Sequence, residues 1–434
     1  VGEQAGRCLV DTGCNALFGV YAGQRMRGSY NAAFGKGALG GSGTAANNTG
    51  GCNVAIGLEA GYGMTSGFMN VLIGKDAGKE LTTAERNIYI GITAGGGTAT
   101  GNDNLAMGYG AACINTGNYN IMFGRCAGRY NTTGIYNVII GTNAAKCHTT
   151  GECNIFIGNE AGSHASSSGG TGANNIGMGC KALTGLTSGE NNVVLGQNAG
   201  GALTSGGSNV ALGVDAMGQG AVTGSQNIAF GYRAGRDVTS GSNNFFGLYA
   251  AGKQHTTGGN NIFIGCKAAS ASVVTGSRNV VLGSLAGEDI TSGTDNVFLG
   301  TYAGRNNTIA TDNIAIGCAA LCSGGALTGV NNIALGRQAG YGVQSGHDNI
   351  FIGCHAGENI TFGDDNVIIG RGIDAPAANT DKYFAIGCGS SRWIQGDSSF
   401  NVCLAGSTIK AIASGGVFCA TSFVGSGANL TGID

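Results

Sequence analysis

Short apolar triplets recur along almost the whole chain, each preceded by asparagine and followed by glycine. The repeating unit reads Asn, aliphatic, apolar, large apolar, Gly, two variable residues, Ala, usually Gly, and then a turn rich in Thr, Ser and Gly. We number its positions from the asparagine, so the triplet occupies positions two to four. Of the 20 spacings between successive asparagines, 17 lie between 16 and 18 residues. The asparagines stand at 15, 31, 53, 70, 87, 104, 120, 137, 154, 175, 192, 209, 227, 243, 261, 279, 296, 313, 332, 349 and 366.

The unit predicts one coil of a β-solenoid. Three apolar β-formers, such as Val297-Phe298-Leu299, predict a short strand. The glycine at position five, present in all 21 units, predicts a bend, and Ala-Gly followed by Thr-Ser-Gly predicts a second corner. Because so short a unit buries its apolar face only against its neighbours, we expect an all-β solenoid (a β-roll) of about 21 coils of roughly 17 residues. Parallel pairing at about 4.8 Å per coil gives a rod of roughly 100 Å.

Alternation along each strand predicts which residues face inward. Successive side chains point to opposite sides, so we expect positions two and four, such as Ile350 and Ile352, to fill the coil and position three to point outward. Strands that are apolar on both faces are buried on both faces, and an outward apolar column therefore predicts a partner. That column reads Leu72, Tyr89, Met122, Ile139, Phe156, Val194, Phe245, Phe263, Val281, Phe298, Phe351 and Ile368, with alanine at most other units.

The asparagine column predicts an amide ladder along one corner of the rod; the alternative is a row of ligands for an ion or a carbohydrate. Three longer spacings predict surface loops at Gly41–Asn48, Ser163–Ala173 and Cys322–Thr328. The repeat divides the chain into a solenoid shaft, 1–371, and a C-terminal cap or transition segment with short strands, 372–434. Since Gly2 and Ala5 already occupy repeat columns, we expect further solenoid before Val1.

Composition narrows the class of protein. Glycine supplies 86 of 434 residues without a three-residue period, which excludes collagen. A hydrophobic content of 42% disfavours disorder, and a net charge of −2 disfavours an electrostatic nucleic-acid binder. The 15 cysteines fall at several repeat positions rather than in a framework, so we expect free thiols and assembly in a reducing cytoplasm.

No motif in the sequence predicts chemistry. The Gly35-x-Gly37-x-x-Gly40 match is expected by chance in so glycine-rich a chain. The pairs Cys147-His148 and Cys354-His355 lack the other ligands of a zinc site. Asp364 with Asp365, and Asp348 with Glu358, are the carboxylate pairs that a glycan-cleaving fibre would need, but turns favour aspartate anyway. The sequons begin at Asn131, Asn359 and Asn429. We assign no catalytic, cofactor-binding or metal residues and expect no enzyme.

The Asn53–Gly57 style of unit resembles the head repeats of trimeric autotransporter adhesins, which form a trimeric β-roll. The Ala-Gly and Thr-Thr-Gly turns, together with Trp393–Asp397 and Ala420–Gly432, are more similar to repeat-rich bacteriophage tail-fibre proteins. This resemblance implies a parallel homotrimer on the virion surface, assembled in the host cytoplasm. Its function would be that of a tail- or head-fibre shaft that projects a host-recognition element. Its partners would be itself, other fibre proteins and a host surface glycan or receptor, with no nucleic acid and no membrane insertion. The alternatives are a bacterial surface adhesin or filament subunit, and a fibre-borne polysaccharide depolymerase.

Overall fold

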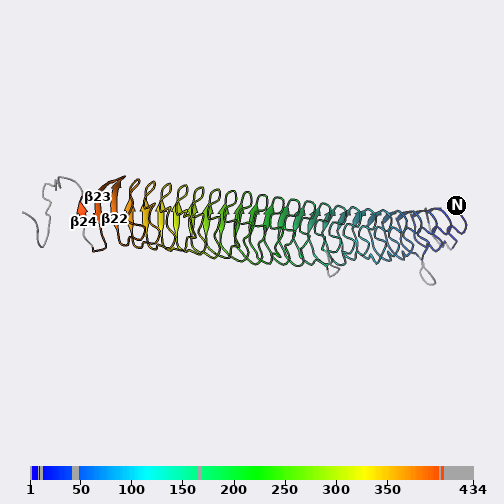
Figure 1. Cartoon of the computed structure of the whole chain (residues 1–434). Helices are drawn as coiled ribbons and strands as arrows, with labels where there is room; N and C mark the ends of the chain where they lie inside the picture. The colour runs from blue at the N-terminus through cyan, green and yellow to red at the C-terminus, as the bar shows by residue number, and fades with distance from the viewer. Residues whose placement is uncertain are drawn as a thin grey trace, which may run out of the picture.

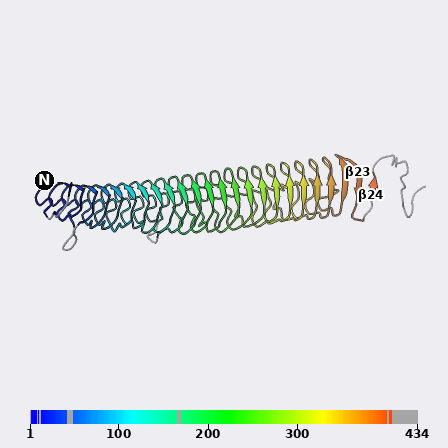
Figure 2. The ribbon, with the colours of Figure 1, turned by 180° about the vertical axis from the view of Figure 1, so that it is seen from behind.

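The computed structural model describes residues 2–7, 9, 13–41, 48–164, 169–399 and 402–404, and these form a long rod of stacked coils. Figure 2 shows the same rod from behind, with one strand per coil aligned along one side. Within the described ranges the secondary structure is β-strand and turn, without an α-helix.

The expected all-β solenoid of about 21 coils is confirmed. Its strands are β1 (Ala16–Phe18), β2 (Ala32–Phe34), β3 (Val54–Ile56), β4 (Val71–Ile73), β5 (Ile88–Ile90), β6 (Leu105–Met107), β7 (Ile121–Phe123), β8 (Val138–Ile140), β9 (Ile155–Ile157), β10 (Ile176–Met178), β11 (Val193–Leu195), β12 (Val210–Leu212), β13 (Ile228–Phe230), β14 (Phe245–Gly247), β15 (Ile262–Ile264), β16 (Val280–Leu282), β17 (Val297–Leu299), β18 (Ile314–Ile316), β19 (Ile333–Leu335), β20 (Ile350–Ile352) and β21 (Val367–Ile369).

Every strand pairs in parallel with the strand of the next coil, position for position. Phe298 of β17 lies opposite Ala315 of β18, for example. The longer units keep this register: Ala33 lies opposite Ala55 across a 22-residue spacing, and Phe156 lies opposite Gly177 across a 21-residue spacing. The extra residues therefore leave the coil in turns without shifting the sheet.

The expected orientation of the strands is wrong. In strands β2–β21 the middle residue, position three, is buried inside the coil, and Leu72, Phe298 and Phe351 are fully buried. Positions two and four, including Ile350 and Ile352, point outward instead. The asparagine at position one explains this orientation. Its amide is buried, and position three lies two residues further along the strand and therefore on the same, inward face.

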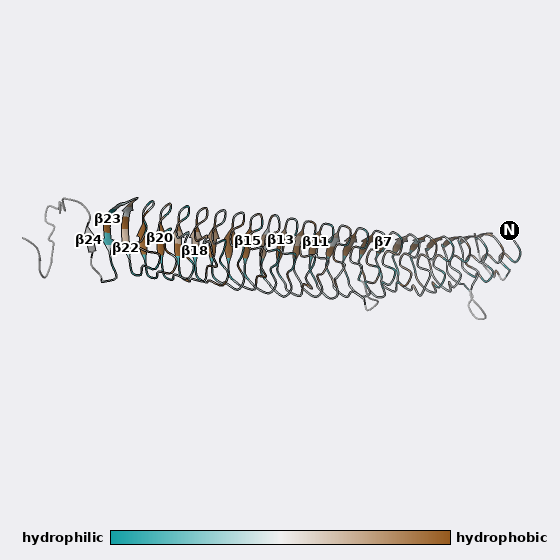
Figure 3. Ribbon diagram, in the orientation of Figure 1, coloured by the Kyte–Doolittle hydropathy of each residue, from teal (hydrophilic) through white to brown (hydrophobic). Residues whose placement is uncertain are grey.

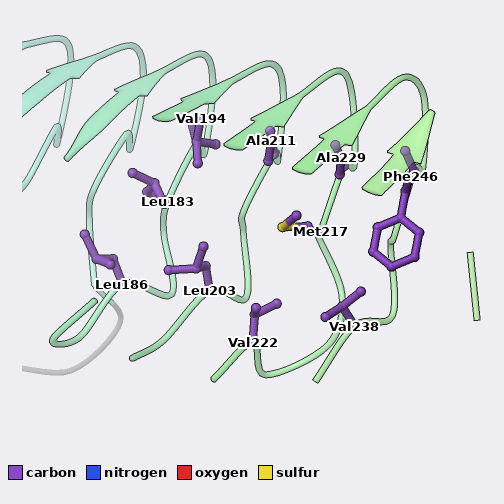
Figure 4. Packing of buried hydrophobic residues seen from close by; sticks show 14 of the residues in the cluster. Leu183, Leu186, Val194, Leu203, Ala211, Met217, Val222, Ala229, Val238 and Phe246 are labelled. Atoms are coloured by element: carbon purple, nitrogen blue, oxygen red, sulfur yellow. The ribbon is translucent and has the colours of Figure 1, made fainter. Parts of the chain in front are cut away.

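Three inward columns make up the hydrophobic core, and Figure 4 shows the first and the third of them in adjacent coils. Position three varies in size from glycine in β10 to tyrosine in β5, and position eight is a buried alanine in most coils. The third column rises from the opposite corner, where Leu203, Val222 and Val238 stack below the strands. Large residues in the first column sit above small alanines in the second, so the coil is filled without changing its width.

The asparagine ladder is confirmed. The backbone N–H and the side-chain amide of Asn279 both donate to Oδ1 of Asn261, at 2.9 and 3.1 Å. The same amide also donates to the Gly293 carbonyl oxygen at 2.9 Å. Oδ1 of Asn279 in turn accepts from the N–H and the amide of Asn296 at 3.1 and 3.0 Å. Each amide is thus saturated by neighbouring coils, which is why it tolerates full burial.

One coil departs from the expected register. The sequence places Asn243 in the ladder, but the structure places Asn244 there, with its N–H donating to Asn227 Oδ1 at 3.1 Å. Phe246, rather than Phe245, is therefore the buried residue of that strand. Leu248 stands where the other coils have their bend glycine, with a φ of 78°. Glycine at position five is consequently not universal.

The bend glycine is required at most coils for two reasons. Gly57 has a φ of 135°, and a Cβ on it would lie 2.5 Å from the carbonyl oxygen of Gly74 in the next coil. Other corners place ordinary residues in the left-handed region, including Met69 and Tyr119 just before the ladder asparagine. Stacking of identical corners holds these residues in a conformation that an isolated chain would avoid.

The regular coils end in a different arrangement. Strand β22 (Phe384–Cys388) still pairs in parallel with β21, and the Tyr383 N–H donates to Asn366 Oδ1 at 2.9 Å, so tyrosine completes the ladder. Strand β23 (Ser391–Gly396) then pairs antiparallel to β22, and β24 (Val402–Leu404) pairs antiparallel to β23. The short strands expected within 372–434 are therefore present, whereas Ala420–Gly432 lies outside the described residues.

Candidate functional site

The outward side of the sheet is an apolar face that runs the length of the rod. Positions two and four of β1–β21 are Val, Ile, Leu, Phe, Met or Ala, and Gly247 alone lacks a side chain. Most of them are partly exposed in the single chain, and the more exposed members include Ile352 at 37% and Phe230 at 54%. Figure 3 shows the corresponding brown band along one side. We call these two columns the outward apolar face.

The other sides of the coil carry polar groups that are bonded along the rod, with single exposed apolar residues such as Ile309 and Phe362 among them. Threonine hydroxyls form a second ladder, in which Thr116 Oγ1 donates to the Thr132 carbonyl oxygen at 2.7 Å and Thr291 Oγ1 to that of Thr308 at 2.8 Å. Exposed ion pairs join neighbouring coils, such as Arg278 with Asp295 at 2.6 Å. Such exposed pairs contribute little to stability. The amphipathic contrast therefore singles out the outward apolar face.

The third inward column contains a group of buried polar residues that the sequence reasoning missed. Asn115, Asn131 and His148 occupy it in three successive coils, and His255 lies further along the rod. The Asn131 amide donates to Asn115 Oδ1 at 2.9 Å. Burial lowers the pKa of His148 and of His255 to about 4, because water no longer stabilises the imidazolium. Both rings are thus neutral at pH 7 and occupy core positions that have no access to a substrate.

The carboxylates considered for hydrolysis serve the backbone of neighbouring coils. Asp364 Oδ1 accepts from the His347 N–H at 2.8 Å, and the Asp364 N–H donates to Asp381 Oδ1 at 2.9 Å. Asp348 and Asp365 occupy left-handed corners, with φ of 56° and 59°, where aspartate is favoured. This arrangement accounts for the aspartates without a reaction.

The two Cys-His pairs do not belong to a metal-binding cluster among the described residues. His148 is inside the coil, while His355 is on the surface between Arg337 and Glu358, at 2.6 and 2.7 Å. An arginine N–H can only donate to Nε2, so the Nδ1 proton faces Glu358. Within the described residues, no group of three or more His, Cys, Asp or Glu side chains could hold a metal ion.

The remaining sequence features lie as follows. The 12 cysteines whose side chains the structure describes, from Cys14 to Cys388, are free thiols. Asn131 is buried, the Asn359 amide donates to the Ala375 carbonyl oxygen at 2.7 Å, and Asn429 lies outside the described residues. Residues 42–47 and 165–168 of the first two expected loops also lie outside them. In the third loop, Gly324 and Gly325 line a shallow hollow beside Asn306.

No helix in the described part of the chain is long and apolar enough to cross a membrane. No family model matches the chain, nor does any curated protein or solved structure. The outward apolar face is therefore the structural feature that bears most directly on function.

Proposed function

We propose that this chain is the shaft of a fibre and that copies of it pack together through the outward apolar face. The observation that carries the proposal is the continuity of this face over 21 successive strands. At roughly 50 Å² per exposed side chain, its two columns present on the order of 2,000 Å² of apolar surface, whereas a soluble monomer usually exposes a few hundred. A stable interface needs only about 800 Å² per partner.

Packing between copies of the same chain explains why the face is unbroken. A different partner would have to match the 4.8 Å repeat over the full rod, whereas a second copy has that repeat already. Closure about an axis buries the face of every copy equally, and the resemblance to trimeric β-rolls sets the number at three. The product is a stiff rod of roughly 100 Å whose core and interface both run lengthwise.

The setting we propose is a viral tail or head fibre, displayed on the virion after assembly in the host cytoplasm. One support is the Trp393–Asp397 segment, which is similar to a segment of tail-fibre proteins. The other is the regular surface of the rod, which suits a structural spacer better than an enzyme. In this proposal the shaft joins other fibre proteins and holds a host-recognition element away from the particle. The rod itself catalyses nothing, so purified fibre should leave host capsule or lipopolysaccharide unshortened on a gel.

Light scattering tests the packing. The double substitution Val297→Asp and Leu299→Asp places two charges on the outward apolar face, and we expect the trimer mass to be lost. Thr301→Asp is the matched control, because this exposed residue of the same coil lies beyond the strand. It should leave the mass unchanged. A monomeric wild-type chain, or a double variant that remains trimeric, would refute the proposal.

A further inference from the structure

The outward apolar face has a border at each end of its strands. The start border is the residue just before each ladder asparagine, and the end border is position six, just after the bend. Every charged residue on the end border of the 21 coils is basic and exposed: Lys36, Lys75, Arg125, Arg337 and Arg371. The start border has the opposite bias, with aspartate in five coils (Asp103, Asp295, Asp312, Asp348 and Asp365) and arginine in two (Arg86 and Arg278).

Three start-border aspartates lack a cation of their own. Arg86 and Arg278 are each neutralised by the aspartate of the next coil, at 2.7 and 2.6 Å. By contrast, Asp312, Asp348 and Asp365 form no ion pair with any described residue. Asp348 and Asp365 are exposed on successive coils, about 4.8 Å apart, so their charges repel each other in the single chain.

The end border of the same coils carries Arg337 and Arg371. Arg337 is bonded to Nε2 of His355 at 2.6 Å, and Arg371 has no ion-pair partner among the described residues. The two borders lie at opposite ends of each strand, so one copy cannot bring its own arginines to its own aspartates. A second copy can.

Cyclic closure brings the borders of neighbouring copies together. When every sheet faces a common axis, each strand runs toward the start of the next copy's strand, so an end border meets a start border all along the rod. The rotation keeps equivalent coils at the same height. Arg371 then faces Asp365 of the next copy, and Arg337 lies within one coil, about 4.8 Å in height, of Asp348.

The other coils fit this arrangement. Lys36 shares its coil with Tyr30, and Arg125 shares its coil with Tyr119, so each cation meets an exposed aromatic ring of the next copy. Both start-border arginines share their coils with an uncharged end-border residue. No coil sets like charges against each other.

We propose that these borders hold neighbouring copies parallel and in register, with Arg337 and Arg371 of one copy paired with Asp348 and Asp365 of the next. The inference rests on the proposed packing through the outward apolar face and adds which residues meet. Exposed pairs add little affinity, but facing like charges exclude wrong arrangements. In an antiparallel pair, the aspartates would lie at the opposite end of the rod from the partner's two arginines.

Cysteine cross-linking tests the register. The coil of β15 has the exposed Cys266 on its end border and Asn260 on its start border. Asn260→Cys suits the site, because start-border cysteines such as Cys52 have the same positive φ. A short bis-maleimide should join these chains into covalent dimers and trimers on a denaturing gel. Val273→Cys is the control, since Val273 is 56% exposed beside the buried Val274, at the corner opposite the strands, and should stay monomeric.

Charge reversal tests the residues. Asp348→Arg with Asp365→Arg sets cations against cations, and the start border tolerates arginine in other coils. On dilution, light scattering should show the trimer dissociating at a concentration about tenfold higher or more. Adding Arg337→Asp and Arg371→Asp should restore the wild-type value to within about threefold.

The mass of the wild-type chain separates the two failures. A monomeric wild type would refute both the packing and this inference. A trimer in which Asn260→Cys does not cross-link, Val273→Cys cross-links equally, or charge reversal has no effect would overturn this inference and leave the packing in place.

Discussion

Acidification should loosen the rod at the two coils whose cores contain a neutral histidine. Nε2 of His148 lies 3.1 Å from the Asn154 amide nitrogen, and the ring lies edge-on to Phe156. His255 bonds to the Gly258 carbonyl oxygen at 2.7 Å and lies against Phe246 and Phe263. Neither core can solvate an imidazolium, so protonation requires the coil to open.

The sign and size of this pH effect on stability follow from the linkage between proton binding and folding. The unfolded pKa of histidine is about 6.5, and burial lowers the folded pKa of both residues to about 4. Stability is therefore complete above pH 6.5, falls as the pH drops below 6.5, and stops falling below about pH 4. Between pH 7.5 and pH 5.0 each histidine should remove about 2 kcal/mol from the opening free energy of its coil.

Hydrogen exchange read by mass spectrometry measures opening coil by coil, once the intrinsic pH dependence of exchange is divided out. The chain supplies its own control substitutions. Asn131 occupies the preceding coil at the position of His148, and Val274 bridges to His255 from the next coil. His148→Asn and His255→Val should each abolish the extra loss of protection at pH 5.0 in their own coil. Equal pH dependence in wild type and variants would refute the reasoning.

Other substitutions test the packing and the corners. Asn279→Ala leaves the Asn296 backbone N–H without its acceptor and removes one acceptor of the Asn296 side-chain amide, so the free energy of unfolding should fall by about 3 kcal/mol in denaturant titrations. Phe298→Ala should lower it by about 3–5 kcal/mol, because the ring is fully buried; a loss below 1 kcal/mol would contradict the inward orientation. Gly57→Ala should destabilise by about 2 kcal/mol or more through its clash with the next coil. Met69→Gly should raise the melting temperature, because Met69 is 51% exposed with a φ of 57°.

The repeat could be predicted from the sequence because its signals are local and recur many times. Each triplet lies between an asparagine and a turn, and its period alone sets the parallel register between coils. The inward face of the strand was harder to predict, because positions two to four are all apolar. Alternation alone allows either position three or positions two and four to point inward. The signal that distinguishes them was present: positions two and four are mostly Val, Ile or Leu, whereas position three ranges in size from Gly177 to Tyr89, as an interior column can.

Features that depend on a single coil could not be predicted from the repeat. Asn243 and Asn244 are adjacent, and only stacking on Asn227 selects the second. His148 stands in a segment that reads as an exposed turn, so its burial appears only once the third inward column is known. A pocket lined by Tyr383 and Arg392 forms where the repeat has ended, and there the antiparallel return of β23 brings its walls together.

The unchanged register across longer units makes the rod a molecular ruler. Ala33 and Ala55 remain opposite each other although 22 residues separate them, so axial length counts coils and ignores how many residues each coil contains. Recombination between near-identical repeats would add or delete whole coils and change the length in steps of about 4.8 Å. Surface loops could meanwhile vary without altering that length. The length of the rod and the sequence of its surface loops can therefore evolve independently in this architecture.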